Sequence, residues 1–259
     1  MLNYLAATTC PNTLYAVHQC ACFSASPRLS HERAVKRIVR YLKKTRDKGI
    51  IMTPNKEKGI QCYVDADFAE GFSPKTSEDP VSVFSRSGYV IYYYGCPLIW
   101  VSKLQSEISL STVEAEYIAL SQSMRDVIPL MDQITEMDGI FNDSSPKPVL
   151  HCKLFEDRNG ALELAKSPRY RPRMKHIAIK YHHFREHVKL GKVSINAIDT
   201  SEQIADIFTK GLPSISFDYL QYKLLGWKDI RILEGVLQYR HFTTNYRTFK
   251  YVILIIYNI

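Results

Sequence analysis

Four acidic residues at the edges of apolar segments restrict the possible folds of this chain more than any other feature. Asp65 lies in the strand-like run Cys-Tyr-Val-Asp-Ala-Asp-Phe, and Glu116 lies near the start of a helical pattern. Asp157 follows an apolar run that ends in Leu-Phe-Glu, and Asp206 lies in Gln-Ile-Ala-Asp-Ile-Phe-Thr-Lys. Carboxylates beside apolar elements are costly to bring together unless a cation neutralises them. Because magnesium prefers hard oxygen ligands, the set indicates a pair of magnesium ions and phosphoryl-transfer chemistry.

The spacing of apolar and turn residues predicts an α/β domain. Strands are expected at residues 61–68, 88–94, 98–102, 149–155 and 193–198. Gly95-Cys96-Pro97 is expected to form the turn between the second and third strands. Short connections imply that the first three strands form an antiparallel meander. Further helices are expected at residues 159–166, 175–190 and 200–210, the last with a Thr-x-x-Gln cap.

The segment Ser111-Thr112-Val113-Glu114 predicts the start of a long helix. It has the form of a capping box, in which Ser111 is the N-cap and Glu114 reaches back toward it. Pro129 is expected to kink or divide this helix. One buried stripe is expected along it, formed by Val113, Tyr117, Leu120, Met124, Ile128 and Met131.

Residues 1–58 are expected to be helical, with one strongly basic helix at 31–48. Val35, Ile38, Val39 and Leu42 give this helix an apolar face, and Gly49 is expected at C′. The chain carries a net charge of +8, which favours a polyanionic partner. Six cations on the helix, with no compensating acid on their face, are candidates for nucleic-acid contact or for a solvated surface: Arg33, Lys36, Arg37, Arg40, Lys43 and Lys44.

A second basic segment follows the short helix expected at 159–166. It is placed to hold phosphates without reading bases, and the alternative is a solubilising loop. Its cations are Lys166, Arg169, Arg171, Arg173 and Lys175.

Six cysteines without zinc-ligand spacing favour a reduced intracellular setting. The N-terminus lacks a basic n-region, so secretion is not expected, and the apolar end of the chain is too short to cross a bilayer. His183 and His187 are four residues apart and can bind a metal in principle. Without a further ligand motif, packing or surface roles are the favoured interpretation for them.

A resemblance to a known family rests on a series of motifs that occur in order. Among them are Val-Asp-Ala-Asp-Phe-Ala, Ser-Arg-Ser-Gly-Tyr-Val, Trp-Val-Ser-Lys-Leu-Gln, Leu-Ser-Thr-Val-Glu-Ala-Glu-Tyr-Ile-Ala-Leu-Ser, Phe-Glu-Asp-Arg-Asn-Gly-Ala-Leu, Met-Lys-His-Ile-Ala-Ile-Lys-Tyr-His and Gln-Ile-Ala-Asp-Ile-Phe-Thr-Lys. Together they resemble the ribonuclease H domain of copia-type LTR retrotransposon polyproteins, over about residues 60 to 213. Residues 2 to about 55 resemble the segment that joins reverse transcriptase to that domain.

The resemblance implies a ribonuclease H-like fold with a five-stranded mixed sheet, in which three antiparallel strands are followed by two parallel ones. It divides the chain into a helical remnant of the reverse transcriptase thumb or connection region (1–58), a ribonuclease H-like domain (59–213) and a tail without assigned function (214–259). It carries Asp65, Glu116, Asp157 and Asp206 onto the four acidic metal-site positions, with two magnesium ions for which manganese can substitute.

The activity implied is cleavage of the RNA strand of RNA–DNA hybrids, in the cytoplasm (a virus-like particle) or the nucleus. The implied partners are the hybrid and the reverse transcriptase portion of an intact polyprotein, with no membrane. Nothing resembles the paired-aspartate polymerase motif, so the chain is expected to be the C-terminal part of such a polyprotein. The loop at 69–85 departs from the family, and the tail beyond Trp227 is interpreted as read-through sequence. The alternative is a catalytically silent remnant that binds nucleic acid.

Each carboxylate also has a structural alternative. Glu114 is the better fit to the helix cap, which leaves Glu116 for another role. Asp67 shares the strand face of Asp65 and can replace it. Asp157 can cap the helix expected after it, and Asp206 can be a surface residue. The product-releasing loop histidine of many cellular ribonucleases H has no clear counterpart between Ile198 and Asp206.

Overall fold

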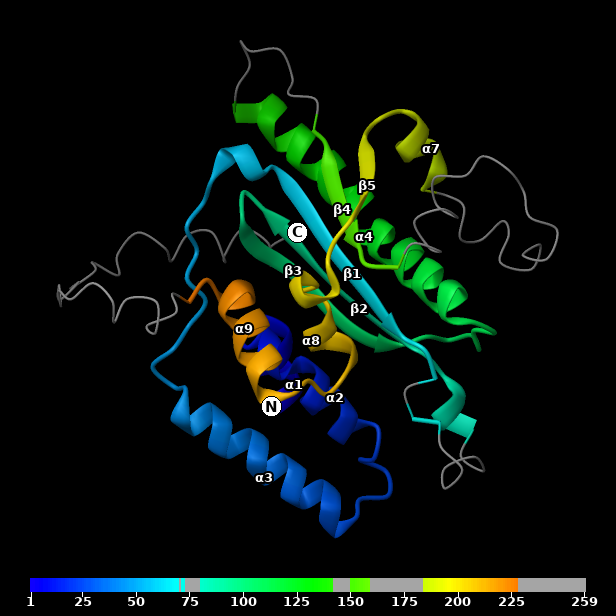
Figure 1. The fold of residues 1–259 in the computed structure, drawn as a ribbon. Helices are drawn as coiled ribbons and strands as arrows, with labels where there is room; N and C mark the ends of the chain where they lie inside the picture. Colours follow the sequence, from blue (N-terminus) through cyan, green and yellow to red (C-terminus); the bar gives the residue numbers. More distant parts are fainter. Residues whose placement is uncertain (70, 73–79, 142–149, 159–183, 228–259) are drawn as a thin grey trace. The chain divides into compact units, whose positions relative to one another are not determined.

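A five-stranded mixed sheet in the order β3-β2-β1-β4-β5 forms the centre of the fold (Figure 1). β2 pairs antiparallel with β1 and with β3, whereas β4 pairs parallel with β1 and with β5. The predicted mixed sheet is therefore confirmed. The strands are β1 (Ile60–Asp67), β2 (Arg86–Tyr93), β3 (Cys96–Leu104), β4 (Cys152–Glu156) and β5 (Val193–Ala197). The structure, a computed structural model, describes residues 1–69, 71–72, 80–141, 150–158 and 184–227.

The β2–β3 hairpin turns on two residues. Tyr94 and Gly95 both have positive φ, 52° and 80°, as a type I′ turn requires, and the ladder resumes at Tyr93 and Cys96. The predicted turn at 95–97 was thus one residue late. Pro97 lies within β3, where an edge strand tolerates a residue that has no backbone N–H.

One face of the sheet is covered by α4 (Thr112–Phe141), together with α7 (Arg185–Lys189) (Figure 1). Ser111 Oγ accepts a bond from the Glu114 backbone N–H at 3.2 Å, as predicted. The Glu114 carboxylate accepts from Leu110 N–H at 2.8 Å, one residue before the N-cap. The helix continues through Pro129, so the proline does not divide it. Of the predicted stripe, Tyr117, Leu120, Met124 and Met131 are buried, and Val113 and Ile128 are partly buried against the same core.

The other face of the sheet is covered by α8 (Asp206–Thr209) and α9 (Ser214–Leu225). The helix predicted at 200–210 is broken: Thr200–Glu202 form a 3₁₀ turn, and Gln203 then adopts an extended ψ of 96°. The N-cap of this 3₁₀ turn is Asp199, whose carboxylate accepts a hydrogen bond from the Ser201 N–H at 2.8 Å. The buried cluster on this face contains Val90, Tyr92, Ile204, Ile207, Phe208, Leu220, Leu224 and Leu225.

The N-terminal helices α1 (Leu2–Thr8) and α2 (Leu14–Ala21) pack against the same side, which agrees with the predicted helical character of this region. Trp100 Nε1 in β3 donates to the Ala6 carbonyl at 2.9 Å. Arg86 in β2, 1% exposed, places Nη1 3.0 Å from His18 Nδ1. The partly buried Trp100 and the buried Arg86 therefore have polar partners in the N-terminal segment.

The basic helix α3 (Leu29–Lys44) is shorter than predicted. Thr45 is its C-cap, and its N–H and hydroxyl both donate to the Tyr41 carbonyl, so Gly49 is not the C′ residue. Ile38 is buried with Ala6 and Val17, but Val39 is 49% exposed and does not belong to the apolar face.

The compact unit extends from Met1 to Trp227 and includes both α3 and α9. Leu220, Leu224 and Leu225 of α9 are buried, so the packed structure continues past residue 213, where the sequence suggested a boundary. The helix expected at 159–166, most of that at 175–190 and the tail at 228–259 lie outside the described residues. Among the residues that are described, no helix is both long enough and apolar enough to cross a membrane.

Removing residues 1–58 is expected to destabilise the sheet, because Trp100 and Arg86 lose partners and the apolar cluster around Ile38 is lost. We expect the 59–227 fragment to lose about 3 kcal/mol or more of unfolding free energy relative to 1–227. Urea unfolding of the two fragments measures the difference. Equal unfolding midpoints would show that the N-terminal helices do not support the sheet.

Candidate active site

Three of the four predicted carboxylates meet at one end of the sheet. Asp65 comes from β1, Glu116 from the first turns of α4, and Asp157 from the residue after β4. One oxygen from each lies within 4.8 Å of the others. Asp65 and Glu116 are 2% and 1% exposed, so the cluster is largely withdrawn from water. Within the described residues Asp67 is not part of this group.

The cluster forms where two parallel strands separate. β1 and β4 pair from Ile60–Cys152 to Tyr63–Phe155 and no further. Beyond that point the fully buried Gln203 lies between them, donating to the Val64 carbonyl at 2.8 Å and to the Phe155 carbonyl at 3.5 Å. Gln203 therefore satisfies backbone groups that the diverging strands leave unpaired, and it fixes the chain that leads into α8.

Asp157 is oriented by the loop after β5. Thr200 Oγ1 donates to its Oδ2 at 2.9 Å, which leaves Oδ1 buried and without a hydrogen-bond partner among the described residues. Its alternative role as the cap of a helix at 159–166 falls on residues that are not described.

Asp206 occupies a different place from the other three. It is the first residue of α8 and 4% exposed, so it is not a surface aspartate. Its Oδ1 lies 2.9 Å from Lys210 Nζ, and the same ammonium lies 3.6 Å from Asp65 Oδ2. The Thr209 hydroxyl also donates to Asp65 Oδ2. Asp206 is thus joined to the cluster through Asp65 and a lysine.

Close approach of α8 to β2 requires a glycine beside Asp65. Gly88 pairs with Asp65 in the β1–β2 ladder. A Cβ at Gly88 would lie 2.6 Å from Thr209 Cγ2 and 2.8 Å from Phe208 Cβ. The missing side chain lets Thr209 reach Asp65.

A fifth acid, Glu156, is fully buried beside the cluster and was missed by the sequence analysis. It shares a strand face with the buried Cys152 and Leu154, a signal that the strand expected at 149–155 lost by ending one residue too early. Its Oε1 accepts from the Arg158 backbone N–H at 3.1 Å, while Oε2 has no hydrogen-bond partner among the described residues.

Burial and mutual repulsion perturb these acids strongly. Burial, followed by the negative charge of Glu156, raises the pKa of Glu116 well above its usual value. Burial and then Asp65 raise the pKa of Asp206 to about 7, although Lys210 opposes the shift. Burial alone would lower the pKa of Lys210, but the charges of Asp65 and Asp206 outweigh it and raise that pKa. The pKa values of the acids and of the lysine are all raised, as expected where negative charge is in excess.

The donor set fits a hard divalent cation. Glu116 Oε2 and Asp157 Oδ1 are buried without hydrogen-bond partners in the described part of the chain, and both residues belong to the three-carboxylate group. Oxygen ligands with unused lone pairs, held close together at low exposure, are the environment that magnesium or manganese occupies in proteins.

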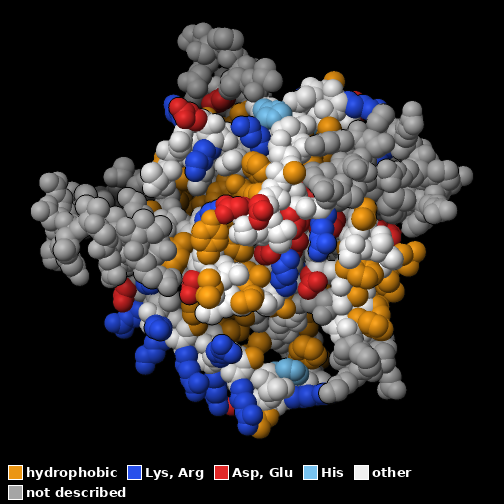
Figure 2. Space-filling view, viewed as in Figure 1, with side chains coloured by type: hydrophobic (Ala, Val, Ile, Leu, Met, Phe, Trp, Pro, Cys, Tyr) orange, Lys and Arg blue, Asp and Glu red, His pale blue; other side chains and the backbone are white. Residues whose placement is uncertain are grey.

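The predicted cations of α3 lie on an exposed row, which Figure 2 shows at the lower left of the view. One expectation was wrong: the row does have an acid, because Glu32 forms an ion pair with Lys36 one turn later. Within the described part of the chain the other five cations form no ion pair, namely Arg33, Arg37, Arg40, Lys43 and Lys44. The second predicted basic segment, with Lys166, Arg169, Arg171, Arg173 and Lys175, lies outside the described residues.

Similar proteins place this chain in a family. It is 33% identical over 223 residues to a retrovirus-related Pol polyprotein from transposon RE2 of Arabidopsis thaliana, covering 86% of this chain and 14% of that protein. It is 32% identical over 217 residues to the Pol polyprotein from transposon TNT 1-94 of Nicotiana tabacum, covering 84% and 15%. The chain belongs to the Pol polyprotein family of retrovirus-related transposons. It spans about one seventh of the length of these relatives. No family model matches it.

The sheet order and strand directions of this Pol polyprotein segment are those of the ribonuclease H-like fold. Among solved structures, LC11-RNase H1 isolated from compost is 15% identical, with a TM-score of 0.41 over 63% of this chain and 99% of that chain. The same protein in complex with an RNA/DNA hybrid gives a TM-score of 0.36 at 16% identity, over 58% and 93%.

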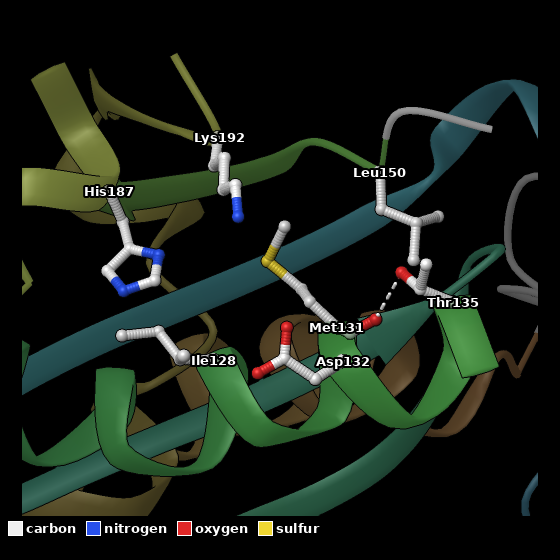
Figure 3. Close-up of a pocket in the computed structure, with 7 residues that line it drawn as sticks. All are labelled: Ile128, Met131, Asp132, Thr135, Leu150, His187 and Lys192. Atoms are coloured by element: carbon white, nitrogen blue, oxygen red, sulfur yellow. Dashed lines mark hydrogen bonds between the residues drawn. The ribbon is translucent and has the colours of Figure 1, made fainter. Parts of the chain in front are cut away.

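A shallow pocket of the Pol segment lies away from the carboxylates, between α4 and the α7–β5 connection (Figure 3). His187, the one described member of the predicted histidine pair, lines it beside Asp132 and Lys192. Its other walls are Ile128, Met131, Thr135 and Leu150. The other member of the pair, His183, lies outside the described residues, so the interpretation of the pair stays a prediction.

The metal-free protein is expected to lose stability as pH rises from about 4 to 7. Across this window folded Asp206, with a pKa of about 7, holds a proton that the unfolded chain has released near its ordinary value of 3.8. The raised pKa of Glu116 acts in the same direction. Glu116→Gln should therefore raise the unfolding free energy at pH 8 by about 1–3 kcal/mol.

Urea unfolding in a chelator at pH 5 and pH 8 measures this effect. Glu136→Gln, an exposed change on the same helix, is the control and should match the unmodified protein. A Glu116→Gln protein that is less stable than the control at pH 8 would mean that the carboxylates are not in net repulsion.

Proposed function

We propose that this Pol segment is a metal-dependent endonuclease that cuts the RNA strand of RNA–DNA hybrids. The observation that carries the proposal is the convergence of Asp65, Glu116 and Asp157 within 4.8 Å, with buried oxygens that lack partners among the described residues. The relation to Pol polyproteins supports a setting in the reverse transcription of a copia-type retrotransposon, where such cutting removes template RNA.

Two magnesium ions, replaceable by manganese, are proposed as cofactors. Asp65, Glu116 and Asp157 would hold one, and Asp65 with Asp206 would hold the other. Bound there, divalent ions supply an acidified water molecule and neutralise charge on the scissile phosphate. The chain's own contribution is to fix the geometry: Thr200 orients Asp157, and Thr209 orients Asp65.

The reaction proposed is hydrolysis of one phosphodiester bond. A bond forms between the water oxygen and phosphorus, and the bond from phosphorus to the 3′ oxygen breaks. The leaving oxygen takes up a proton, so the products are a 5′-phosphate and a free 3′-hydroxyl. The 2′-hydroxyl distinguishes the RNA strand from the DNA strand.

Phosphate contacts away from the scissile bond are assigned to basic side chains. The exposed cations of α3 and the segment 166–175 would hold the hybrid through its backbone, independently of sequence. Residues 1–58 are proposed to connect to a reverse transcriptase portion in an intact polyprotein, and the site of action to be the cytoplasm or the nucleus.

Asp157→Asn tests the carboxylate site directly. Removing one charged ligand should lower the rate of hybrid cleavage by at least about 100-fold while binding of the hybrid persists. Asp132→Asn, an exposed aspartate on α4 that lines the separate pocket, is the matched control and should cut normally. The assay is cleavage of RNA end-labelled within a hybrid, with binding followed by fluorescence anisotropy.

The outcomes separate a nuclease from a silent remnant. If the unmodified, folded protein binds the hybrid but cuts no RNA in magnesium or manganese, the segment is a binding remnant and the proposal is wrong. If Asp157→Asn cuts as fast as Asp132→Asn, the site of cleavage lies elsewhere.

Arg37→Ala combined with Arg40→Ala tests the basic face of α3. Loss of two phosphate contacts should weaken hybrid binding and reduce the slope of log affinity against log salt by about 1.5–2. Arg125→Ala with Lys189→Ala removes two exposed cations from the α4 side of the sheet and should leave the slope unchanged. An identical slope for both double variants would exclude α3 from the interface.

A further inference from the structure

The position of Lys210 divides the acidic site into two unequal halves. The lysine follows α8, and its backbone N–H donates to the Asp206 carbonyl at 3.2 Å. Its ammonium lies 2.9 Å from Asp206 Oδ1 and 3.6 Å from Asp65 Oδ2, while its side chain is 33% exposed. A positive charge therefore already stands between the two carboxylates that a second divalent ion would have to bridge.

The other half of the site has no comparable cation among the described residues. Glu116 Oε2, Asp157 Oδ1 and Asp206 Oδ1 are all buried without a hydrogen-bond partner in the described chain, but only Asp206 Oδ1 has an ammonium group 2.9 Å away. The nearest cation to Glu116 is Arg158, whose Nε lies 3.9 Å away on a side chain that is 58% exposed. Such an ion pair is long and solvated, so it neutralises little charge. A first divalent ion thus meets open oxygens on this side.

We propose that Lys210 is the resident counter-cation of the Asp65–Asp206 pair and makes the two divalent ions bind with unequal affinity. The first ion enters among Asp65, Glu116 and Asp157. The second binds only when it displaces the Lys210 ammonium from Asp65 and Asp206. This inference deepens the proposed function and depends on it, because it assigns the order in which the same site is filled.

Displacement has a consequence for substrate binding. The freed ammonium is on a partly exposed side chain beside the cluster, where a phosphate of the hybrid can pair with it. Pairing of Lys210 with a phosphate would free the carboxylates of Asp65 and Asp206 from the ammonium. It would therefore favour binding of the second ion. Lys210 is on this account a positioning residue that keeps the site incompletely loaded until nucleic acid arrives.

Manganese binding without nucleic acid tests the proposal. The two dissociation constants are measured by calorimetry and by electron paramagnetic resonance of free manganese. In Lys210→Met the dissociation constant of the second ion should fall toward that of the first. The ratio of the two constants should decrease by about tenfold or more. Lys210→Gln, which retains a side-chain donor but no charge, should show the same narrowing, and Lys210→Arg should restore the original ratio.

A matched control comes from α9. Lys223 is also 33% exposed and also forms an ion pair, with Glu202 away from the cluster. Lys223→Met removes the same charge and should leave both constants unchanged. Circular dichroism establishes that each variant is folded.

Two different failures can be distinguished. If the unmodified protein binds two ions whose constants do not respond to Lys210→Met or Lys210→Gln, the counter-cation role is wrong while the metal site stands. The other failure concerns the metal site itself. If the unmodified protein binds no manganese, or if its manganese binding persists in Asp157→Asn, the proposed function is wrong, and this inference is overturned with it.

Discussion

Repulsion among buried carboxylates is the constraint on which the arrangement of this molecule depends. Asp65, Glu116, Glu156 and Asp206 are each less than 5% exposed, and burial together with neighbouring negative charge raises the pKa of the last three. Bringing these carboxylates together lowers the free energy of unfolding, so favourable contacts in the rest of the fold must offset the repulsion. Stability is thus reduced at the place where oxygen ligands for a cation are gathered.

The scaffold meets that cost through contacts at the end of the sheet. β1 and β4 stop pairing at this end, and Gln203 donates to the Val64 carbonyl where the two strands separate. Gly88 allows α8 to lie directly on β2, which brings Thr209 and Lys210 to Asp65. The N-terminal helices support the same face through Trp100. Residues before and after the ribonuclease H-like segment are therefore part of the structure that holds the site.

The sequence predicted what local patterns determine. Period-two and helical spacing gave five strands and α4, and the Ser111–Glu114 box marked the start of that helix. It failed where tertiary contacts overrule local preference: Gln203 breaks the helix expected at 200–210 because its side chain bridges two strands. The Asp206–Lys210 pair and the burial of Glu156 also depend on packing between distant segments. The strand expected at 149–155 ended one residue before Glu156, so its inward position was not predicted.

The central claim is that Asp65, Glu116 and Asp157 are held together as a cation site. Anomalous diffraction from crystals of the protein soaked in manganese locates the ion without reference to activity. The account predicts a manganese peak within about 2.3 Å of one carboxylate oxygen from each of the three residues. Manganese bound only at surface acids, with the three carboxylates unliganded in a well-ordered map, would contradict it.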